Sequence, residues 1–189
     1  AQADHININK EIVQLNKVDL SDTALTLILD DSTKADTTSS STNWRLEIDQ
    51  MNLSHTAFAM QIPNDSLRLS SYIQQAGLKS GVIDLGESSY KVNQFFISHS
   101  SLNYDTGNTL PASGFDPSHI TLSDIQIQLD SIRYKGKEIQ ALLRTGSAKE
   151  RSGLSFNSLV GKIVSDSTVF QIPHLALQTP YSHLNLQAN

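Results

Sequence analysis

Six histidines are the side chains of this chain best suited to bind a metal or to move a proton: His5, His55, His99, His119, His174 and His183. None of them forms H-x-x-x-H or H-E-x-x-H, and none is followed by a carboxylate at the spacing of metal ligands. His55 and His99 occupy the same place in a repeated pattern, which leaves a paired role open. A polar turn residue copied with its repeat is the simpler interpretation, and we predict neither a metal site nor a cofactor.

Residues able to support covalent or acid–base catalysis are not arranged as such sites require. Gly146-Ser147-Ala148 lacks the G-x-S-x-G order of a nucleophile elbow. Residues 77–81 (Gly-Leu-Lys-Ser-Gly) have the wrong order for a phosphate-binding loop. Asp30 and Asp31 are adjacent, so in a strand their carboxylates point to opposite faces. We therefore predict no catalytic residue and no enzyme, and a hydrolase built on a β-scaffold is the least supported alternative.

Composition and charge exclude several classes of function. The chain has 189 residues, a formal net charge of −5 and a pI near 5.6, which argues against nucleic acid as a partner. It contains no cysteine, so disulfides and thiolate metal sites are excluded. No apolar run approaches the about 18 residues of a transmembrane helix, and residues 1–4 do not resemble a signal peptide. A start inside patterned polar sequence favours a segment of a longer protein.

One apolar spacing recurs along the chain and predicts a repeat-built fold. The pattern is h-x-x-h-x-h, four further residues, and then h-x-h, where h is an apolar residue. A damaged fifth copy begins at Ile172 and has Ser182 where an apolar residue is expected. The four complete copies are Leu15-Val18-Leu20 with Leu25-Leu27, Ile48-Met51-Leu53 with Phe58-Met60, Val92-Phe95-Ile97 with Leu102-Tyr104, and Leu122-Ile125-Ile127 with Ile132-Tyr134.

Alternation with a period of two surrounds these copies and is typical of antiparallel strands with one wet face. Residues 65–77 could be a helix that stops at Gly77 or a strand, and we predict a strand. The four-residue spacer within a copy suits a tight turn, a bulge or a bend in one long strand. Segment 32–43 has no large apolar side chain and is predicted to be a mobile loop. Segment 105–118 is rich in turn formers and is expected to connect strands, with a boundary between two halves as the alternative.

These signals predict an all-β fold in a single domain, 1–189. We expect a repeat-built, twisted antiparallel sheet that curls into an elongated, half-open groove. A β-sandwich, in which a second layer covers the apolar face, is the alternative that the pattern leaves open.

An apolar groove without a polar lining selects acyl chains or the apolar surface of another protein. Matched positions of the repeat provide two rows of candidate groove residues. The first row is Leu20, Leu53, Ile97 and Ile127, and the second is Leu27, Met60 and Tyr104.

Several strings of the sequence resemble the AsmA/TamB-like superfamily of Gram-negative envelope proteins, especially its Bacteroidota members. The resemblance covers residues 12–187 and is best from 115 onward, where residues 115–122 read Phe-Asp-Pro-Ser-His-Ile-Thr-Leu. It continues through Lys149-Glu150-Arg151-Ser152-Gly153-Leu154 and residues 175–182, and upstream it includes Trp44 to Ile48 followed by residues 51–54.

The resemblance implies a taco-shaped β-sheet in the periplasm whose apolar inside conducts phospholipid toward the outer membrane. It also implies an N-terminal membrane anchor outside this chain and an outer-membrane barrel assembly factor as a partner. No catalytic residues carry over from such a family. We therefore expect a non-enzymatic, lipid-binding and lipid-conducting segment of an envelope-spanning protein. The alternative is a cell-surface or periplasmic interaction module of the adhesin type, built as a β-sandwich.

Overall fold

The computed structural model describes residues 2–28, 43–166 and 169–187, and 75% of the structure is β-strand. This described part contains no α-helix, only the short 3₁₀ turn η1 (Pro63–Asp65). The strands are β1 (Gln2–Asn7), β2 (Ile12–Ser21), β3 (Ala24–Ile28), β4 (Arg45–Ile62), β5 (Leu67–Asp84), β6 (Ser89–Thr106), β7 (His119–Lys135), β8 (Glu138–Glu150), β9 (Ser155–Phe156), β10 (Ser158–Ser165), β11 (Phe170–Gln178) and β12 (His183–Leu186).

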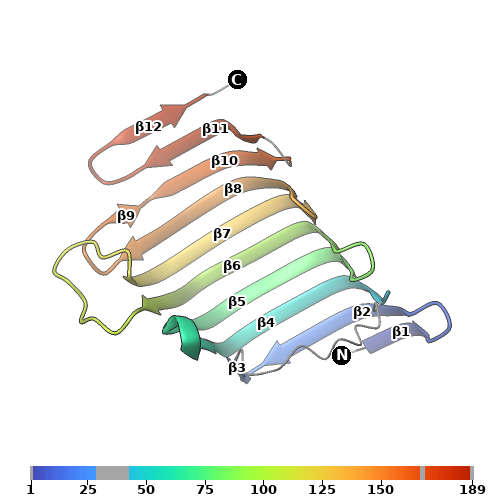
Figure 1. The fold of residues 1–189 in the computed structure, drawn as a ribbon. Helices are drawn as coiled ribbons and strands as arrows, with labels where there is room; N and C mark the ends of the chain where they lie inside the picture. The colour runs from blue at the N-terminus through green and yellow to red at the C-terminus, as the bar shows by residue number, and fades with distance from the viewer. Residues whose placement is uncertain (1, 29–42, 167–168, 188–189) are drawn as a thin grey trace.

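All of these strands belong to one sheet of 12 strands that does not close on itself (Figure 1). The order is β1-β2-β4-β5-β6-β7-β8-β10-β11-β12, with β3 beside β4 and β9 beside β8. The expected open, curled all-β sheet is confirmed, and the described strands form one layer rather than the two packed sheets of a sandwich.

The expectation of a wholly antiparallel sheet is wrong at one place. β2 and β3 both pair with β4 in parallel, whereas every other pair of neighbours among the described strands is antiparallel. The offset in register is the same for both, with Ser21 opposite Ser54 and Ala24 opposite Ala57. β2 and β3 are therefore one interrupted strand. A parallel neighbour needs a long connection that brings the chain back, and here it includes residues 29–42, outside the described part.

Three further predictions concern individual segments. Residues 67–84 form strand β5, so the choice of strand over helix for residues 65–77 is confirmed from Leu67 onward. The predicted loop 32–43 lies outside the described residues apart from Asn43. Segment 105–118 contains the connection from β6 to β7, and these two strands pair from Ser89 opposite Lys135 to Asp105 opposite His119.

Two lines of irregular positions cross the long strands, and they explain the spacing of the repeat. At these positions the pairing register skips, and six of them have a left-handed backbone with φ between 47° and 54°. The first line contains Asn16, Asp49, Ser80, Asn93 and Ser131, with positive φ at Ser80 and Ser131. The second contains Asp22, His55, Gln74, His99 and Asp124, with positive φ at all but Gln74.

A left-handed residue such as His55, or a position left out of the pairing such as Asp49, interrupts the alternation of a strand, so that apolar residues three or five positions apart face the same side. Ile48 and Met51 span the first line, and Leu53 and Phe58 span the second. Of the three alternatives for the spacer, the structure adopts a bend within one continuous strand. Asn, Asp and His tolerate the left-handed conformation better than other non-glycine residues, which accounts for His55 and His99 at this place.

A hydroxyl group closes the bend on three strands of the second line. The residue after the left-handed position is Thr or Ser, and its hydroxyl donates to the carbonyl oxygen two residues earlier. The distances are 2.9 Å from Thr23 to Ser21, 3.2 Å from Thr56 to Ser54 and 2.9 Å from Ser100 to Ser98. The Ser100 hydroxyl also accepts from the backbone N–H of Gln74 on β5 at 3.1 Å.

Replacing Ser100 with alanine is expected to lower the free energy of unfolding by about 1–3 kcal/mol, because the N–H of Gln74 and the carbonyl of Ser98 lose a buried hydroxyl partner. Ser100 is only 1% exposed, so water cannot replace the hydroxyl. Chemical denaturation of Ser100→Ala measures this cost. Ser101→Ala is the control, because that adjacent hydroxyl makes no hydrogen bond among the described residues. Equal costs for the two variants contradict the role assigned to Ser100.

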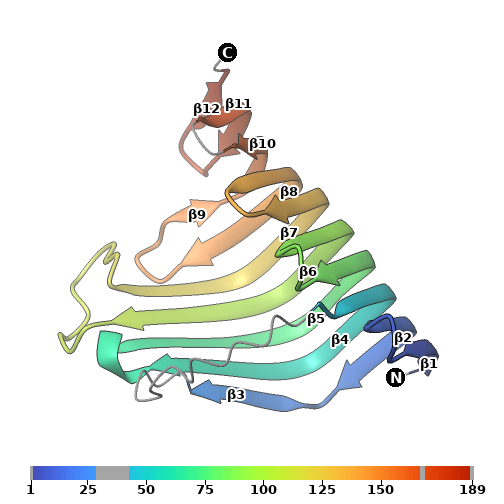
Figure 2. The ribbon, with the colours of Figure 1, turned by 45° about the vertical axis from the view of Figure 1, so that its right-hand side comes forward.

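The bends turn the long strands back on themselves, and the sheet becomes an open trough. Figure 2 shows the central strands β4 to β8 running together and curving at the same end. Since β4 to β7 all bend along the same two lines, these strands share the curvature and the pairing between them is kept on both arms.

Candidate functional site

The apolar side chains lie in rows that run across the strands. Residues directly opposite each other in a β-ladder point to the same face. One such row, the central row, crosses five neighbouring strands and contains Leu20, Leu53, Ala76, Ile97 and Ile127. Another row, the second row, contains Leu27, Met60, Leu69, Tyr104 and Ile120.

The seven predicted groove residues are thus brought together on one face. The central row contains Leu20, Leu53, Ile97 and Ile127, and the second row contains Leu27, Met60 and Tyr104. Leu20 and Leu27 are each 42% exposed, and the other five are half-buried.

Sequence reasoning missed a longer row on the same face. It crosses nine strands, from β2 to β12, and it carries the apolar surface across the whole C-terminal part of the sheet. Its members are Val18, Met51, Leu78, Phe95, Leu129, Leu143, Gly161, Leu175 and Leu186.

The missing signal was the direction in which each strand must be read. Strand β5, read backward, has apolar or small residues at the same intervals as β4 read forward: Ile83, Gly81, Leu78, Ala76, Ser71 and Leu69 lie opposite Leu46, Ile48, Met51, Leu53, Phe58 and Met60. β7 must also be read backward, so the forward pattern that starts at Leu122 is a coincidence of spacing. Ile127 nevertheless belongs to the row predicted for it, because it takes the same place in the pattern whichever way β7 is read.

The apolar face is the inner side of the trough. The described residues contain four hydrophobic side chains that are almost inaccessible, at 3–8% exposure, and all of them lie on this face: Val18, Ile48, Ala76 and Ile125. No second layer of described residues covers them, since the strands form a single sheet. Side chains converge on the inside of a bend and shield one another, whereas on the outside they diverge. The trough therefore has a floor that is shielded near the bends and arms that remain open.

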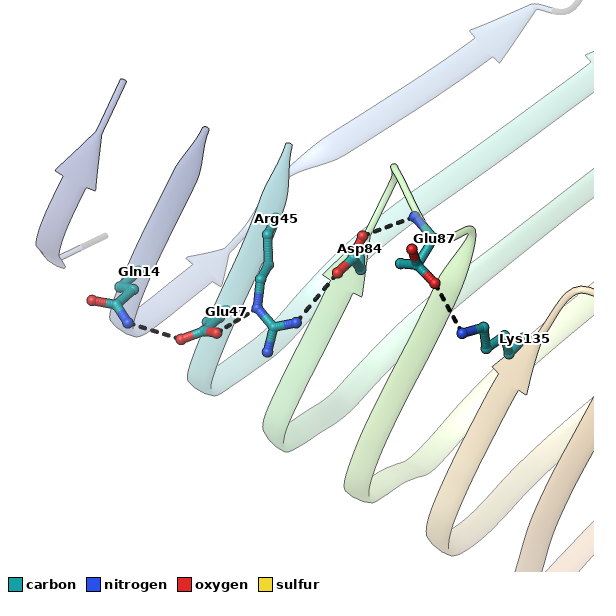
Figure 3. A network of polar contacts seen from close by, with 6 residues as sticks. All are labelled: Gln14, Arg45, Glu47, Asp84, Glu87 and Lys135. Carbon is teal, nitrogen blue, oxygen red and sulfur yellow. Dashed lines mark hydrogen bonds and ion pairs between the residues drawn. The ribbon is translucent and has the colours of Figure 1, made fainter. Parts of the chain in front are cut away.

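The outer face is polar, and a chain of contacts runs across it near one end of the strands (Figure 3). Gln14 donates to Glu47 at 2.8 Å, and Arg45 Nε donates to the other oxygen of Glu47 at 2.7 Å. Arg45 Nη1 reaches Asp84 at 3.3 Å. The backbone N–H of Glu87 donates to Asp84 at 2.9 Å, and Lys135 donates to the Glu87 carboxylate at 2.9 Å. These contacts tie β2, β4, β5 and β7 together.

The network shifts the pKa values of its members in the directions expected of paired charges. The pKa of Glu47 is lowered by the hydrogen bond from Gln14 and then by the one from Arg45. The pKa of Asp84 is lowered chiefly by the backbone N–H of Glu87, with Arg45 next. The pKa of Lys135 is raised by Glu87. All of these groups are therefore charged at neutral pH, and this face remains wet.

A second polar cluster fixes the connection between β6 and β7. Asp116 accepts from the backbone N–H of Ala112 and of Ser118, both at 2.9 Å, and its Oδ2 lies 2.9 Å from Nδ1 of His119. These contacts lower the pKa of Asp116 from its ordinary 3.8 to about 2, the backbone bonds being the main cause. His119 is only 4% exposed at the start of β7, so the cluster anchors the connection to the sheet.

Acid is expected to release this anchor. Because the pKa of Asp116 is lower in the folded chain than in the unfolded chain, its contribution to stability is present above about pH 4 and is lost as the pH falls toward about 2. The unfolding temperature of the wild type should therefore fall more steeply between pH 4 and 2 than that of Asp116→Asn. Asp65→Asn, which removes an exposed carboxylate from η1, is the control. Parallel curves for wild type and Asp116→Asn contradict this role.

Neither a metal centre nor a membrane-spanning helix is found in the described ranges. Among residues 2–28, 43–166 and 169–187, no three His, Asp or Glu side chains are grouped so that they could hold a metal ion. His55 and His99 lie on β4 and β6, with β5 between them. No helix in this part of the chain is long and apolar enough to cross a membrane. The predicted carboxylate pair Asp30–Asp31 lies outside the described residues.

The fold and this face together define a class of protein: a repeat-built, single-layer β-sheet, open at both edges and curled around an apolar inner face. Comparisons with protein-family models, with curated proteins and with solved structures found no match to this chain.

Proposed function

We propose that the chain binds acyl lipid along the inner face of the trough and lets it slide, as a non-enzymatic segment of a lipid-conducting protein. One observation carries this proposal: an apolar face that runs from β2 to β12 and that no other described part of the chain covers. Exposed apolar surface of this extent normally marks a site of interaction.

The rows suit a ligand that is long, apolar and featureless. Each methylene group that moves from water onto an apolar surface gains about 0.8 kcal/mol. Over several methylene groups this sum holds an acyl chain firmly, while no single polar contact fixes its position. The rows run across the strands and therefore along the trough, so a chain that moves in this direction meets the same kind of surface at each strand.

The resemblance to AsmA/TamB-like proteins supports a more specific form of the proposal. In that form the ligand is a phospholipid, the location is the periplasm of a Gram-negative bacterium, and the partner is an outer-membrane barrel assembly factor. An interaction module of the adhesin type remains the competing function, with an apolar protein segment in the trough in place of lipid.

Lipid binding is tested on the purified, delipidated chain. We expect a fluorescent fatty acid to increase in emission on binding and to be displaced by unlabelled phospholipid, and we expect native mass spectrometry of the undelipidated chain to detect co-purified lipid. A chain that neither co-purifies with lipid nor binds the probe contradicts the proposal and favours the interaction module.

A further inference from the structure

Two cationic side chains lie directly opposite each other on the outer face of the sheet. Lys91 on β6 is the register partner of Arg133 on β7, and both are exposed. Like charges at directly opposite positions of a ladder repel each other and destabilise a sheet. Such a pair normally has carboxylates close by that offset the repulsion.

No carboxylate among the described residues forms an ion pair with either Lys91 or Arg133. Their register neighbours in the same row are Val82 on β5 and Gln140 on β8, both uncharged. The contrast with the network of Figure 3 is direct, because there Arg45 and Lys135 each have a carboxylate partner.

The two cations line a surface hollow of about 330 Å³ at the ends of β6, β7, β8 and β10. Three cationic and two anionic side chains border it, namely Lys91, Arg133 and Lys135 against Glu138 and Asp166. Lys135 is offset by Glu87, and Asp166 accepts from the backbone N–H of Val169 at 2.8 Å. The five bordering charges sum to one positive charge, and Lys91 and Arg133 are the two bordering cations without an ion-pair partner among the described residues.

Further groups in the hollow complete an amphipathic pocket. Ser89 and Gln140 supply neutral hydrogen-bond donors, whereas Val164 supplies apolar surface. A guanidinium group binds phosphate with two parallel hydrogen bonds, and an ammonium group adds a point charge. A phosphate group between the two side chains would remove their repulsion and use the donors of both.

We propose that Lys91 and Arg133 form a binding site for a phosphate group, separate from the apolar face and independent of acyl binding. The phosphate is either free or the headgroup of an amphiphile whose apolar part rests on Val164, which lies in the same register row as Arg133 and Gln140. The two sources share the same recognition chemistry and differ in whether the apolar wall contributes to affinity.

Titration calorimetry of the whole chain tests the site with two probes, inorganic phosphate and dihexanoyl phosphatidic acid as a monomer. We expect each single variant, Lys91→Gln and Arg133→Gln, to weaken binding of both probes about tenfold, because a charge-assisted hydrogen bond is lost. Lys79→Gln is the matched control, since Lys79 is an exposed cation on the same face whose partners are Gln50 and Gln94. It should bind both probes like the wild type.

A thermal measurement separates a binding site from general charge. The unfolding temperature of the wild type should rise in phosphate relative to chloride at equal ionic strength. In Lys91→Gln/Arg133→Gln this rise should vanish, while the unfolding temperature in chloride should be higher than that of the wild type because the repulsion is gone. Tighter binding of the amphiphile assigns the site to a headgroup, and equal binding assigns it to free phosphate. No binding, or an equal loss in Lys79→Gln, overturns the proposal, whether or not the apolar face binds fatty acid.

Discussion

Met60→Glu is expected to weaken acyl binding by about tenfold or more while the sheet stays folded. Met60 lies in the second row between Leu27 and Leu69 and is half-buried. A glutamate there can therefore reach water, but it places a charge where the acyl chain would lie. Loss of contact with only two methylene groups costs about 1.6 kcal/mol, which corresponds to more than tenfold in affinity. Displacement of a fluorescent fatty acid measures the effect.

Gln61→Glu is the matched control for this prediction. Gln61 is the next residue of β4, so its side chain points to the opposite, outer face, where it is exposed. The substitution adds the same charge within one residue of Met60. If both variants lose affinity equally, general repulsion of the anionic probe is responsible. If Met60→Glu unfolds the chain, the second row is a folding core and the groove hypothesis is wrong.

Ile48→Ala is expected to lower the free energy of unfolding by about 2–5 kcal/mol, the range found for large-to-small substitutions in cores. Ile48 is 5% exposed although the sheet is a single layer. Its burial comes from the bend, where Leu15 on β2 and Leu78 near Gly81 on β5 close around it. Denaturant unfolding monitored by circular dichroism measures the cost.

Leu27→Ala provides the comparison for Ile48→Ala. Leu27 lies on the same apolar face but is 42% exposed on β3, away from the floor of the trough. Its truncation should cost less than about 1 kcal/mol, because little apolar surface is returned to water. The difference between the two variants tests whether the curvature of the sheet creates the core. Similar costs indicate that the apolar face is covered evenly along its whole length, as in a sandwich.

The apolar positions of β2, β4 and β6 could be predicted from the sequence because the repeat shows them in reading order. The same intervals in β5 were hidden by strand direction and by small residues, since Gly81, Ala76 and Ser71 stand where β4 has Ile48, Leu53 and Phe58. A hydrophobic pattern detects large side chains, and the inside of a bend has room for few of them. At Gly81 an added Cβ would lie 3.0 Å from the Leu78 side chain.

The parallel pairing of β2 and β3 with β4 could not be predicted for a different reason. Both directions of a strand place alternate residues on the same face, so periodicity contains no information about polarity. Direction depends on the connection between the strands. Residues 30–42, which are polar apart from Ala35, carry no pattern that distinguishes a turn from a longer return.

By itself, the sequence determined the class of fold, the apolar face and the two rows of candidate residues, because alternation and repeat spacing are local properties of a strand. It also contained the intervals of three and five residues between apolar positions, but it did not show that these intervals mark bends in the strands. Only the tertiary structure showed that left-handed residues such as His55 on β4 and His99 on β6 align across the sheet, on either side of β5, and bend the sheet toward its apolar side. The physical reason is that a bend is local to one strand, whereas a trough exists only when the register places the bends of all strands in line.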